Sequence, residues 1–276
     1  MKDLRPVALL LAFLFSGVIG LFVAASFNMT TPPPHVMVVA GDPLTEAIKS
    51  AVMIHFVDST GTGVLIGRKK LENGNWRYAV MTAYHVVDSI RERLVQEPEN
   101  EAIIKQLVLV YQEHFHAPLT KVRTSVVDFE WMIPNMDWAI IIVDLPVKLP
   151  CAQLATRQEF ESIQPYDHIY GVGSDGSDGL FFREGVIAST NGTQPFIDAV
   201  EYPWDSNQDA FFRAYHGIFY GASGGPVFSR QGKIIGIYNG FVHLHRGSPV
   251  TNVCIVAKAH LATEALVHSN ITIVEN

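Results

Sequence analysis

The chain has 276 residues, of which 48% are hydrophobic, and a formal net charge of -7, so it is long enough for one large domain or two modest ones. This mild acidity lacks the positive charge with which nucleic-acid-binding proteins attract phosphates, and we expect no nucleic-acid partner. The two cysteines are too few for a disulfide framework, and the sequence has neither the CxxC nor the HExxH signature of a zinc site.

The N-terminal segment is the most apolar part of the chain. Val7 to Ala25 is almost entirely apolar and would be about 28 Å long as a helix, close to the thickness of a bilayer core. Lys2 and Arg5 precede it, which favours a cytoplasmic N-terminus and a chain that crosses the membrane. We predict that residues 1–26 form one hydrophobic helix, either a membrane anchor or a signal peptide, followed by a proline-containing linker over 27–44.

Short strand-like segments follow from about residue 51 onward. Apolar residues are concentrated in brief runs that turn-forming residues separate, which is typical of antiparallel sheets. These runs cover residues 51–57, 64–71, 76–82, 107–111, 122–127 and 139–143 in the first half, and 169–172, 180–188, 210–215, 226–228, 233–238 and 253–256 in the second. Asn73-Gly74 predicts a hairpin between two of them.

Two later segments have helical spacing instead. Residues 88–106 are rich in Glu, Arg, Leu and Ile, with a break expected at Pro98, and residues 257–268 place Leu and Ala on one face. Many short strands and one late helix predict an all-β protein of two packed antiparallel barrels with a C-terminal helix. We expect the first barrel over residues 45–148, and a linker, the second barrel and the helix over 149–276.

One glycine-rich stretch, Gly221-Ala222-Ser223-Gly224-Gly225-Pro226, carries an isolated serine. Such a tight turn can aim the Ser223 hydroxyl and nearby backbone N–H groups at one point, as acyl transfer requires. Two upstream motifs supply a candidate base and a candidate carboxylate: His85 within Thr82-Ala83-Tyr84-His85-Val86-Val87, and Asp137 within Asp137-Trp138-Ala139-Ile140-Ile141. Each motif abuts a strand-like segment, so we interpret the three residues as one hydrolytic site.

The order His85, Asp137, Ser223 resembles that of the chymotrypsin-type (trypsin-like) serine peptidases, and most of all their bacterial HtrA-type branch. Four further stretches are similar to strands of that family: Thr60–Ile66, Ile169–Gly173, Arg183–Ala188 and Ile234–Gly240. The resemblance covers most of the chain, roughly Ile54 to Ala262. It implies a chymotrypsin-like fold of two six-stranded antiparallel β-barrels.

The resemblance also implies a role for each motif residue. Ser223 would be the nucleophile, His85 the general base and then acid, and Asp137 the carboxylate that orients the imidazole. The backbone N–H groups of Gly221 and Ser223 would form the oxyanion hole. The residues expected to line the substrate cleft are Gly217, Tyr220, Tyr238 and Gly240.

The resemblance also bears on which substrate side chain the pocket would accept. Gly217 stands where trypsin-like enzymes have an acidic residue, so we expect no preference for Lys or Arg at the cleavage site. His216 and His243 are close enough in sequence to shape the pocket and to favour an acidic or polar side chain. Ala222 stands where trypsin-like zymogens have an aspartate, and we therefore expect no activation by release of a new N-terminus.

The resemblance predicts a serine endopeptidase that acts on peptides or proteins outside the cytoplasm, either anchored in the membrane through its N-terminal segment or secreted. It implies no cofactor and no metal. Too few residues follow His268 for the PDZ domain that HtrA-type proteins usually carry. The sequence indicates no oligomeric state.

Two other functions remain open. A catalytically inactive trypsin-like protein would keep the barrels and bind partners without turnover. A serine esterase is the other alternative, because the Ser223 turn also matches GxSxG. In α/β-hydrolases, however, the acid and the histidine follow the serine, and no aspartate follows Ser223 in this chain.

Three further patterns have ordinary structural explanations. Gly171–Gly176 matches GxGxxG, but strand-like residues follow it where a dinucleotide site needs a helix. The pairs His114/His116 and His243/His245 lack a neighbouring carboxylate or cysteine in sequence, so we expect solvent-facing histidines and no metal. For Cys151 and Cys254, a single bridge and two free thiols are both open.

Overall fold

A computed structural model describes residues 41–56, 59–112, 119–133, 136–174, 179–190, 208–217, 220–243 and 249–268. The expected N-terminal helix and nearly all of the expected linker lie outside these residues, as do His114, His116 and His245. Within the described part of the chain, no helix has the length and apolar character needed to cross a bilayer.

The first barrel closes its strands in the order β1-β2-β3-β6-β5-β4. They are β1 (Ala51–His55), β2 (Thr60–Lys70), β3 (Trp76–Thr82), β4 (Gln106–Tyr111), β5 (Thr120–Ile133) and β6 (Trp138–Leu145). The Asn-Gly signal does form the β2–β3 hairpin: Gly74 has a φ of 87°, and the Asn75 N–H donates to Asn73 Oδ1 over 3.0 Å.

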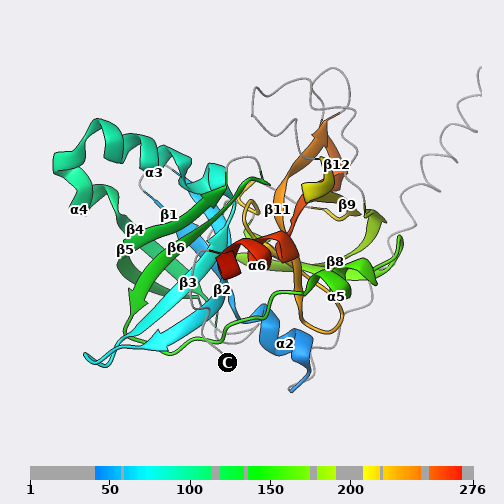
Figure 1. Cartoon of the computed structure of the whole chain (residues 1–276), viewed down its shortest axis with the longest axis horizontal. Helices are drawn as coiled ribbons and strands as arrows, with labels where there is room; N and C mark the ends of the chain where they lie inside the picture. The colour runs from blue at the N-terminus through cyan, green and yellow to red at the C-terminus, as the bar shows by residue number, and fades with distance from the viewer. Residues whose placement is uncertain are drawn as a thin grey trace, which may run out of the picture. The chain divides into compact units, whose positions relative to one another are not determined.

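The second barrel closes in the order β10-β11-β12-β9-β8-β7. Its strands are β7 (His168–Ser174), β8 (Leu180–Ser189), β9 (Phe211–Tyr215), β10 (Pro226–Phe228), β11 (Ile234–His243) and β12 (Pro249–Lys258). Figure 1 shows the first barrel on the left and the second on the right. All strand pairs within the two barrels are antiparallel, so the prediction of an all-β fold with two six-stranded antiparallel barrels is confirmed.

The helices are short and lie outside the barrels' strand order. They are α2 (Pro43–Ile48), α3 (Tyr84–Gln96), the 3-10 turn η1 (Pro98–Asn100), α4 (Glu101–Ile104), α5 (Arg157–Glu161), the 3-10 turn η4 (Gln208–Ala210) and the expected C-terminal helix α6 (Ala259–His268). The helical pattern expected from residue 88 begins earlier, at Tyr84, and stops before Pro98. Proline cannot continue an α-helix, because it lacks the N–H and clashes with the preceding turn.

Three groups of buried side chains form the core. One lies inside the first barrel and includes Leu65, Val80 and Ile141. Another lies inside the second barrel and includes Phe212 and Val227. The third combines residues of both barrels, among them Met81, Trp138 and Ile140 from the first and Tyr170, Val172 and Phe228 from the second. Because this third group is apolar and shared, the two barrels are held as one packed unit.

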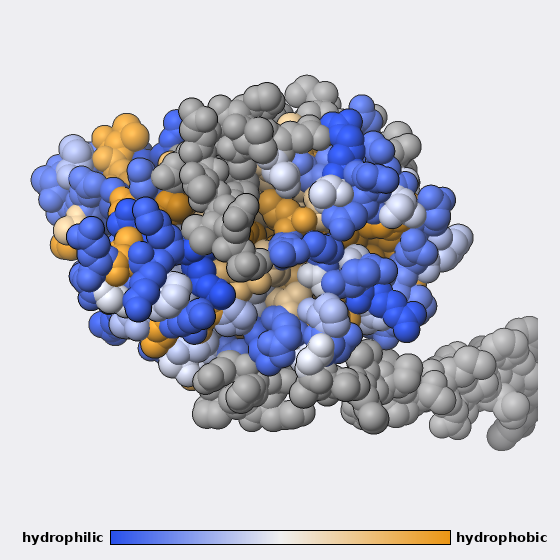
Figure 2. Space-filling view, turned by 60° about the horizontal axis from the view of Figure 1, so that its bottom comes forward, coloured by the Kyte–Doolittle hydropathy of each residue, from blue (hydrophilic) through white to orange (hydrophobic). Residues whose placement is uncertain are grey.

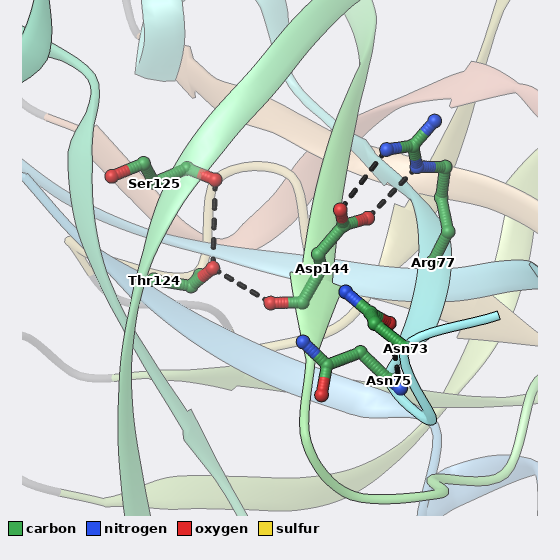
Figure 3. Close-up of polar contacts among 6 residues, drawn as sticks. All are labelled: Asn73, Asn75, Arg77, Thr124, Ser125 and Asp144. Atoms are coloured by element: carbon green, nitrogen blue, oxygen red, sulfur yellow. Dashed lines mark hydrogen bonds and ion pairs between the residues drawn. The ribbon is translucent and has the colours of Figure 1, made fainter. Parts of the chain in front are cut away.

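The outer face of the first barrel carries polar side chains instead. Figure 3 shows Arg77 on β3 opposite Asp144 on β6, where the guanidinium donates to both carboxylate oxygens over 2.8 and 3.0 Å. The Thr124 hydroxyl on β5 donates to the Asp144 carbonyl oxygen over 2.8 Å. The surface shown in Figure 2 is likewise mostly hydrophilic, with small groups of hydrophobic side chains between the polar ones.

Candidate active site

The three motif residues come from different elements that meet between the barrels. His85 is the second residue of α3, directly after β3, and Asp137 immediately precedes β6. Strands β3 and β6 are paired, with Thr82 opposite Ala139, so the ends that carry His85 and Asp137 lie side by side. Ser223 lies in the turn that leads into β10 of the second barrel.

Asp137 and His85 form a direct, buried pair. His85 Nδ1 lies 2.7 Å from Asp137 Oδ2, and the His85 backbone N–H donates to Asp137 Oδ1 over 2.9 Å. The Asp137 side chain is 0% exposed, whereas that of His85 keeps 26% of its surface exposed. Burial raises the pKa of the Asp137 carboxyl, while the hydrogen bonds and the positive charge available from His85 act in the opposite direction.

Asp137 also explains where α3 begins. Ala83, at the N-cap position, offers no side chain to the first turn, yet the Tyr84 N–H donates to the Asp137 carbonyl oxygen and the His85 N–H to its carboxylate. An anionic group at a helix N-terminus is also electrostatically favourable. Asp137 has a φ of 47°, a left-handed conformation that aspartate tolerates better than most residues. One residue thus caps the helix and orients its first histidine.

Asn239 is a site residue that our sequence reasoning missed. It lies in β11 of the second barrel, is 3% exposed, and donates from Nδ2 to Asp137 Oδ2 over 2.6 Å. The carboxylate therefore accepts hydrogen bonds from both barrels. The local sequence Tyr238-Asn239-Gly240 marked this strand as lining a cleft, but no pattern within it indicates a contact with a residue of the other barrel.

Two positions of the turn that carries Ser223 have a backbone conformation that only glycine adopts readily. Gly221 and Gly224 have φ values of 98° and 81°. At Gly224, a Cβ atom would overlap Thr82 Oγ1, the Thr62 carbonyl oxygen and the Ala83 nitrogen. The turn thus packs directly against the residues that precede His85, which brings Ser223 and His85 to the same seam.

Hydrogen bonds hold this turn through its carbonyl groups. The carbonyl oxygens of Gly221, Ala222 and Ser223 accept from Thr62 Oγ1, the Gly225 N–H and the Thr62 N–H, respectively, each over 2.8 Å. The N–H groups of Gly221 and Ser223, by contrast, donate no hydrogen bond to any residue that the structure describes. Two backbone donors in one turn with no acceptor among the described residues are what an oxyanion hole requires.

The Ser223 hydroxyl itself makes no hydrogen bond within the described part of the chain. The contact to His85 that a general base needs is therefore open in this structure. Such contacts are often long in free enzymes and shorten when substrate binds.

The residues expected to line the substrate cleft are placed unequally. Tyr220 is 79% exposed, and a Cβ atom on Gly240 would meet nothing within 4 Å, so both border open space. Gly217 lies against the Arg183 guanidinium. Tyr238 is different: it is 1% exposed and lines a small pocket together with Gly217 and Ala222.

His216 makes structural contacts and also lines a small pocket next to Gly217 and Ala222. It is 3% exposed; its Nδ1 lies 2.7 Å from the Tyr238 hydroxyl and its Nε2 lies 3.0 Å from the Arg183 carbonyl oxygen. Burial lowers the pKa of His216 to about 4, so the ring is neutral at neutral pH. The expectation that His216 favours an acidic or polar substrate side chain has no support in this geometry.

The remaining sequence patterns have structural explanations. Gly171 to Ser174 belong to β7, and the next described element is β8, so no helix follows the glycine-rich stretch. Cys151 and Cys254 are both free thiols, and burial raises their pKa values to about 11 and about 12. Among the described residues, no group of three or more His, Cys, Asp or Glu side chains is placed to hold a metal ion.

Comparison with known proteins shows the family and the fold of this chain. A family model described as a trypsin-like peptidase domain matches residues 61–237. Two solved structures share the fold, the HtrA-type protease AlgW with a tripeptide and a variant of the same protease with a tripeptide, at 18% and 16% identity and a TM-score of 0.58 each. Each alignment covers 83% of this chain and 62% of the other, so this chain spans less than two thirds of those proteins. No curated protein matches the sequence.

Proposed function

This chain belongs to the family of trypsin-like peptidase domains, and on that premise we propose that it is a serine endopeptidase with Ser223, His85 and Asp137 as its catalytic triad. The observation that carries the proposal is the buried Asp137–His85 pair, 2.7 Å apart, beside a turn in which the Gly221 and Ser223 N–H groups donate to no residue that the structure describes. A base oriented by a carboxylate and a preorganised pair of donors are the two components that serine acyl transfer needs.

In the proposed reaction, Ser223 Oγ attacks the carbonyl carbon of the scissile peptide bond while His85 Nε2 takes the hydroxyl proton. Asp137 accepts the Nδ1–H of His85, which fixes the tautomer and stabilises the imidazolium. The N–H groups of Gly221 and Ser223 donate to the oxygen that becomes negatively charged. His85 then protonates the leaving amine. In the second half of the reaction, water attacks the acyl-enzyme while His85 takes its proton, and His85 returns that proton to Ser223 Oγ as the acyl group leaves.

The substrates in this proposal are peptides or proteins, and catalysis takes place outside the cytoplasm. The location rests on the apolar segment Val7 to Ala25 and on Lys2 and Arg5 before it. Gly217, Tyr220 and Gly240 remain the proposed substrate contacts, because Tyr220 is exposed and Gly240 borders open space. We no longer include the side chain of Tyr238.

The test is hydrolysis of casein and of a peptide library by the full chain and by Ser223→Ala. Loss of the nucleophile is expected to lower kcat by about 10⁶-fold, with the fold unchanged by circular dichroism. Ser229→Ala is the matched control, since Ser229 lies just after β10 in the same barrel. A fluorophosphonate is expected to label the wild-type chain at Ser223, as located by mass spectrometry.

The outcomes separate the three functions. Peptide hydrolysis that survives Ser223→Ala would show that the site is wrong. A folded wild-type chain that neither hydrolyses peptides nor reacts with the fluorophosphonate would be a binding protein. Turnover of p-nitrophenyl esters with none of casein or the library would identify an esterase.

A further inference from the structure

Thr62 reaches from the first barrel to the nucleophile turn of the second. It lies near the start of β2, is 0% exposed, and faces residues 221–225 across the seam. Its position in the motif Thr60–Ile66 is explained by the strand alone, and neither the triad nor the oxyanion hole uses its side chain.

Every polar group of Thr62 is engaged. Its backbone N–H donates to the Ser223 carbonyl oxygen over 2.8 Å, and its hydroxyl donates to the Gly221 carbonyl oxygen over 2.8 Å. The same hydroxyl accepts the Ser174 N–H at the end of β7 over 3.0 Å. Its carbonyl oxygen accepts the Thr82 hydroxyl over 2.7 Å. Thr62 therefore connects the turn to β7 and, through Thr82, to the residues before His85.

The direction of the hydroxyl hydrogen bond is fixed by this arrangement. A threonine hydroxyl has one proton; because a backbone N–H donates to it from Ser174, that proton is left for the Gly221 carbonyl oxygen. Both carbonyls that flank Ala222 are thus held by one residue of the other barrel. The one peptide unit between these two carbonyls carries the Ser223 N–H. The Gly221 N–H belongs to the preceding peptide unit, and the hydrogen bond to the Gly221 carbonyl holds Gly221 from its other side.

We propose that Thr62 is a positioning residue that holds the Gly221–Ser223 turn, and with it the two oxyanion-forming N–H groups, in the orientation needed for catalysis. The inference rests on the proposed peptidase function. Thr62 does not touch the substrate; it acts through the backbone of Gly221 and Ser223. Gly221, with its φ of 98°, is free to adopt other conformations when its carbonyl is released, because glycine pays no steric penalty for them.

The test compares Thr62→Val, which keeps the shape and removes the hydroxyl, with Thr62→Ser, which keeps the hydroxyl. Thr124→Val is the matched control: the Thr124 hydroxyl also donates to a backbone carbonyl over 2.8 Å, but far from the seam. Thr62→Val is expected to lower kcat for peptides by about 100-fold, the loss that small misplacements of catalytic groups cause. KM is expected to stay close to the wild-type value, and Thr62→Ser is expected to restore kcat.

Amide hydrogen exchange supplies a readout that needs no turnover. Thr62→Val is expected to speed exchange in residues 220–225, and Thr62→Ser and Thr124→Val are expected to leave it unchanged. If Thr62→Val does not fold, Thr62→Ala removes the hydroxyl without retaining bulk and is compared in the same way.

The results judge the inference independently of the proposed function. Wild-type kcat together with unchanged exchange in a folded Thr62→Val or Thr62→Ala chain overturns it. Equal losses in Thr62→Ser and Thr62→Val also overturn it, since the hydroxyl would then be irrelevant. If the wild-type chain itself is inactive, the peptidase proposal fails, and faster exchange confined to the hydroxyl-deleted variants still establishes that Thr62 holds the turn.

Discussion

Asp137 immediately precedes strand β6, and Asp144 lies near the other end of that strand. Each aspartate accepts hydrogen bonds on both carboxylate oxygens. Their surroundings are opposite. Asp137 is 0% exposed and its donors are a histidine and the Asn239 amide. The Asp144 side chain is 25% exposed and its partner is the permanently charged guanidinium of Arg77.

The difference shows that carboxylates with similar numbers of hydrogen bonds depend on them to very different degrees. At the exposed end, water competes for both charges, so the ion pair contributes little. At the buried end, water is excluded and the carboxylate depends on protein donors, so each of them determines its charge and orientation. Burying the Asp137 carboxylate costs folding free energy, and in the proposed triad this carboxylate orients the base His85.

The largest contrast is expected from replacing each aspartate by asparagine. Asp137→Asn should lower kcat/KM by about 10⁴-fold, because an amide no longer holds the His85 tautomer that accepts the Ser223 proton. Thermal stability should not fall in parallel. Burial raises the pKa of Asp137, so at neutral pH its ionised form costs folding free energy that a neutral amide does not. Peptide kinetics and calorimetry on the same preparations check both parts.

Asp144→Asn is the matched control for that change. It should leave kcat/KM unchanged and lower the stability slightly, through the Arg77 pair. Equal losses of activity in the two variants would remove the distinction between the two ends of β6. A loss of stability in Asp137→Asn as large as that of a core mutation would show that the buried carboxylate is structural.

A contrast of intermediate size is expected between two histidines of the second barrel. His216 is buried against Tyr238 and Arg183, whereas the His168 side chain is 63% exposed beside Glu184. Burial lowers the pKa of His216 from 6.5 to about 4, and the Arg183 charge acts in the same direction. Between these values the unfolded chain binds the proton more readily, so stability is lost as the pH falls from about 6.5 towards 4, by about 3 kcal/mol.

Urea unfolding at several pH values checks this slope. His216→Gln should remove the part of the pH dependence that His216 contributes between pH 6.5 and 4, because glutamine does not titrate, and His168→Gln serves as the exposed-histidine control. Each variant is compared with the wild type at the same pH, so other titrating groups, Asp137 among them, cancel. An unchanged slope in His216→Gln would contradict the assignment.

The smallest effect is expected at the exposed ion pair. Arg77→Leu should lower the free energy of unfolding by less than about 1 kcal/mol and should leave kcat/KM unchanged, because the pair is solvated and far from the seam. The loss should shrink further in high salt, where screening weakens the wild-type pair. Denaturation with urea at low and high salt measures it, and a larger, salt-independent loss would mean that the pair stabilises the barrel edge by packing.

Much of the fold was predictable because the signals for it are local. Apolar runs separated by turns located the strands, and Asn73-Gly74 marked its hairpin. Two short helices were missed although the sequence held signals for them. Asp42 and Pro43 cap and open α2, and Thr156 and Glu159 form the capping box of α5. The true start of α3 was beyond local signals, since its cap comes from Asp137.

The site divides in the same way. The Ser223 turn and the motifs around His85 and Asp137 are short and distinctive, so the sequence alone nominates their residues, and the structure pairs two of them, His85 and Asp137. Thr62 and Asn239 act across gaps of 159 and 102 residues, on Gly221 and Asp137. A polar residue in a strand looks the same in sequence whether it meets water or the opposite barrel. Tyr238 and His216 were expected at the cleft and its pocket; both are almost fully buried, and they contact each other.

The exchange of Thr62 and Asn239 between the barrels has a consequence for a chain that is still being synthesised. In the proposed triad, the first barrel carries the base His85 and the carboxylate of Asp137. Asn239, which also donates to that carboxylate, is synthesised about a hundred residues later. The nucleophile, for its part, gains its fixed backbone only by docking onto a strand made long before. On the proposed mechanism, a half-made or half-folded chain would therefore lack both the complete triad and the fixed turn that carries the nucleophile.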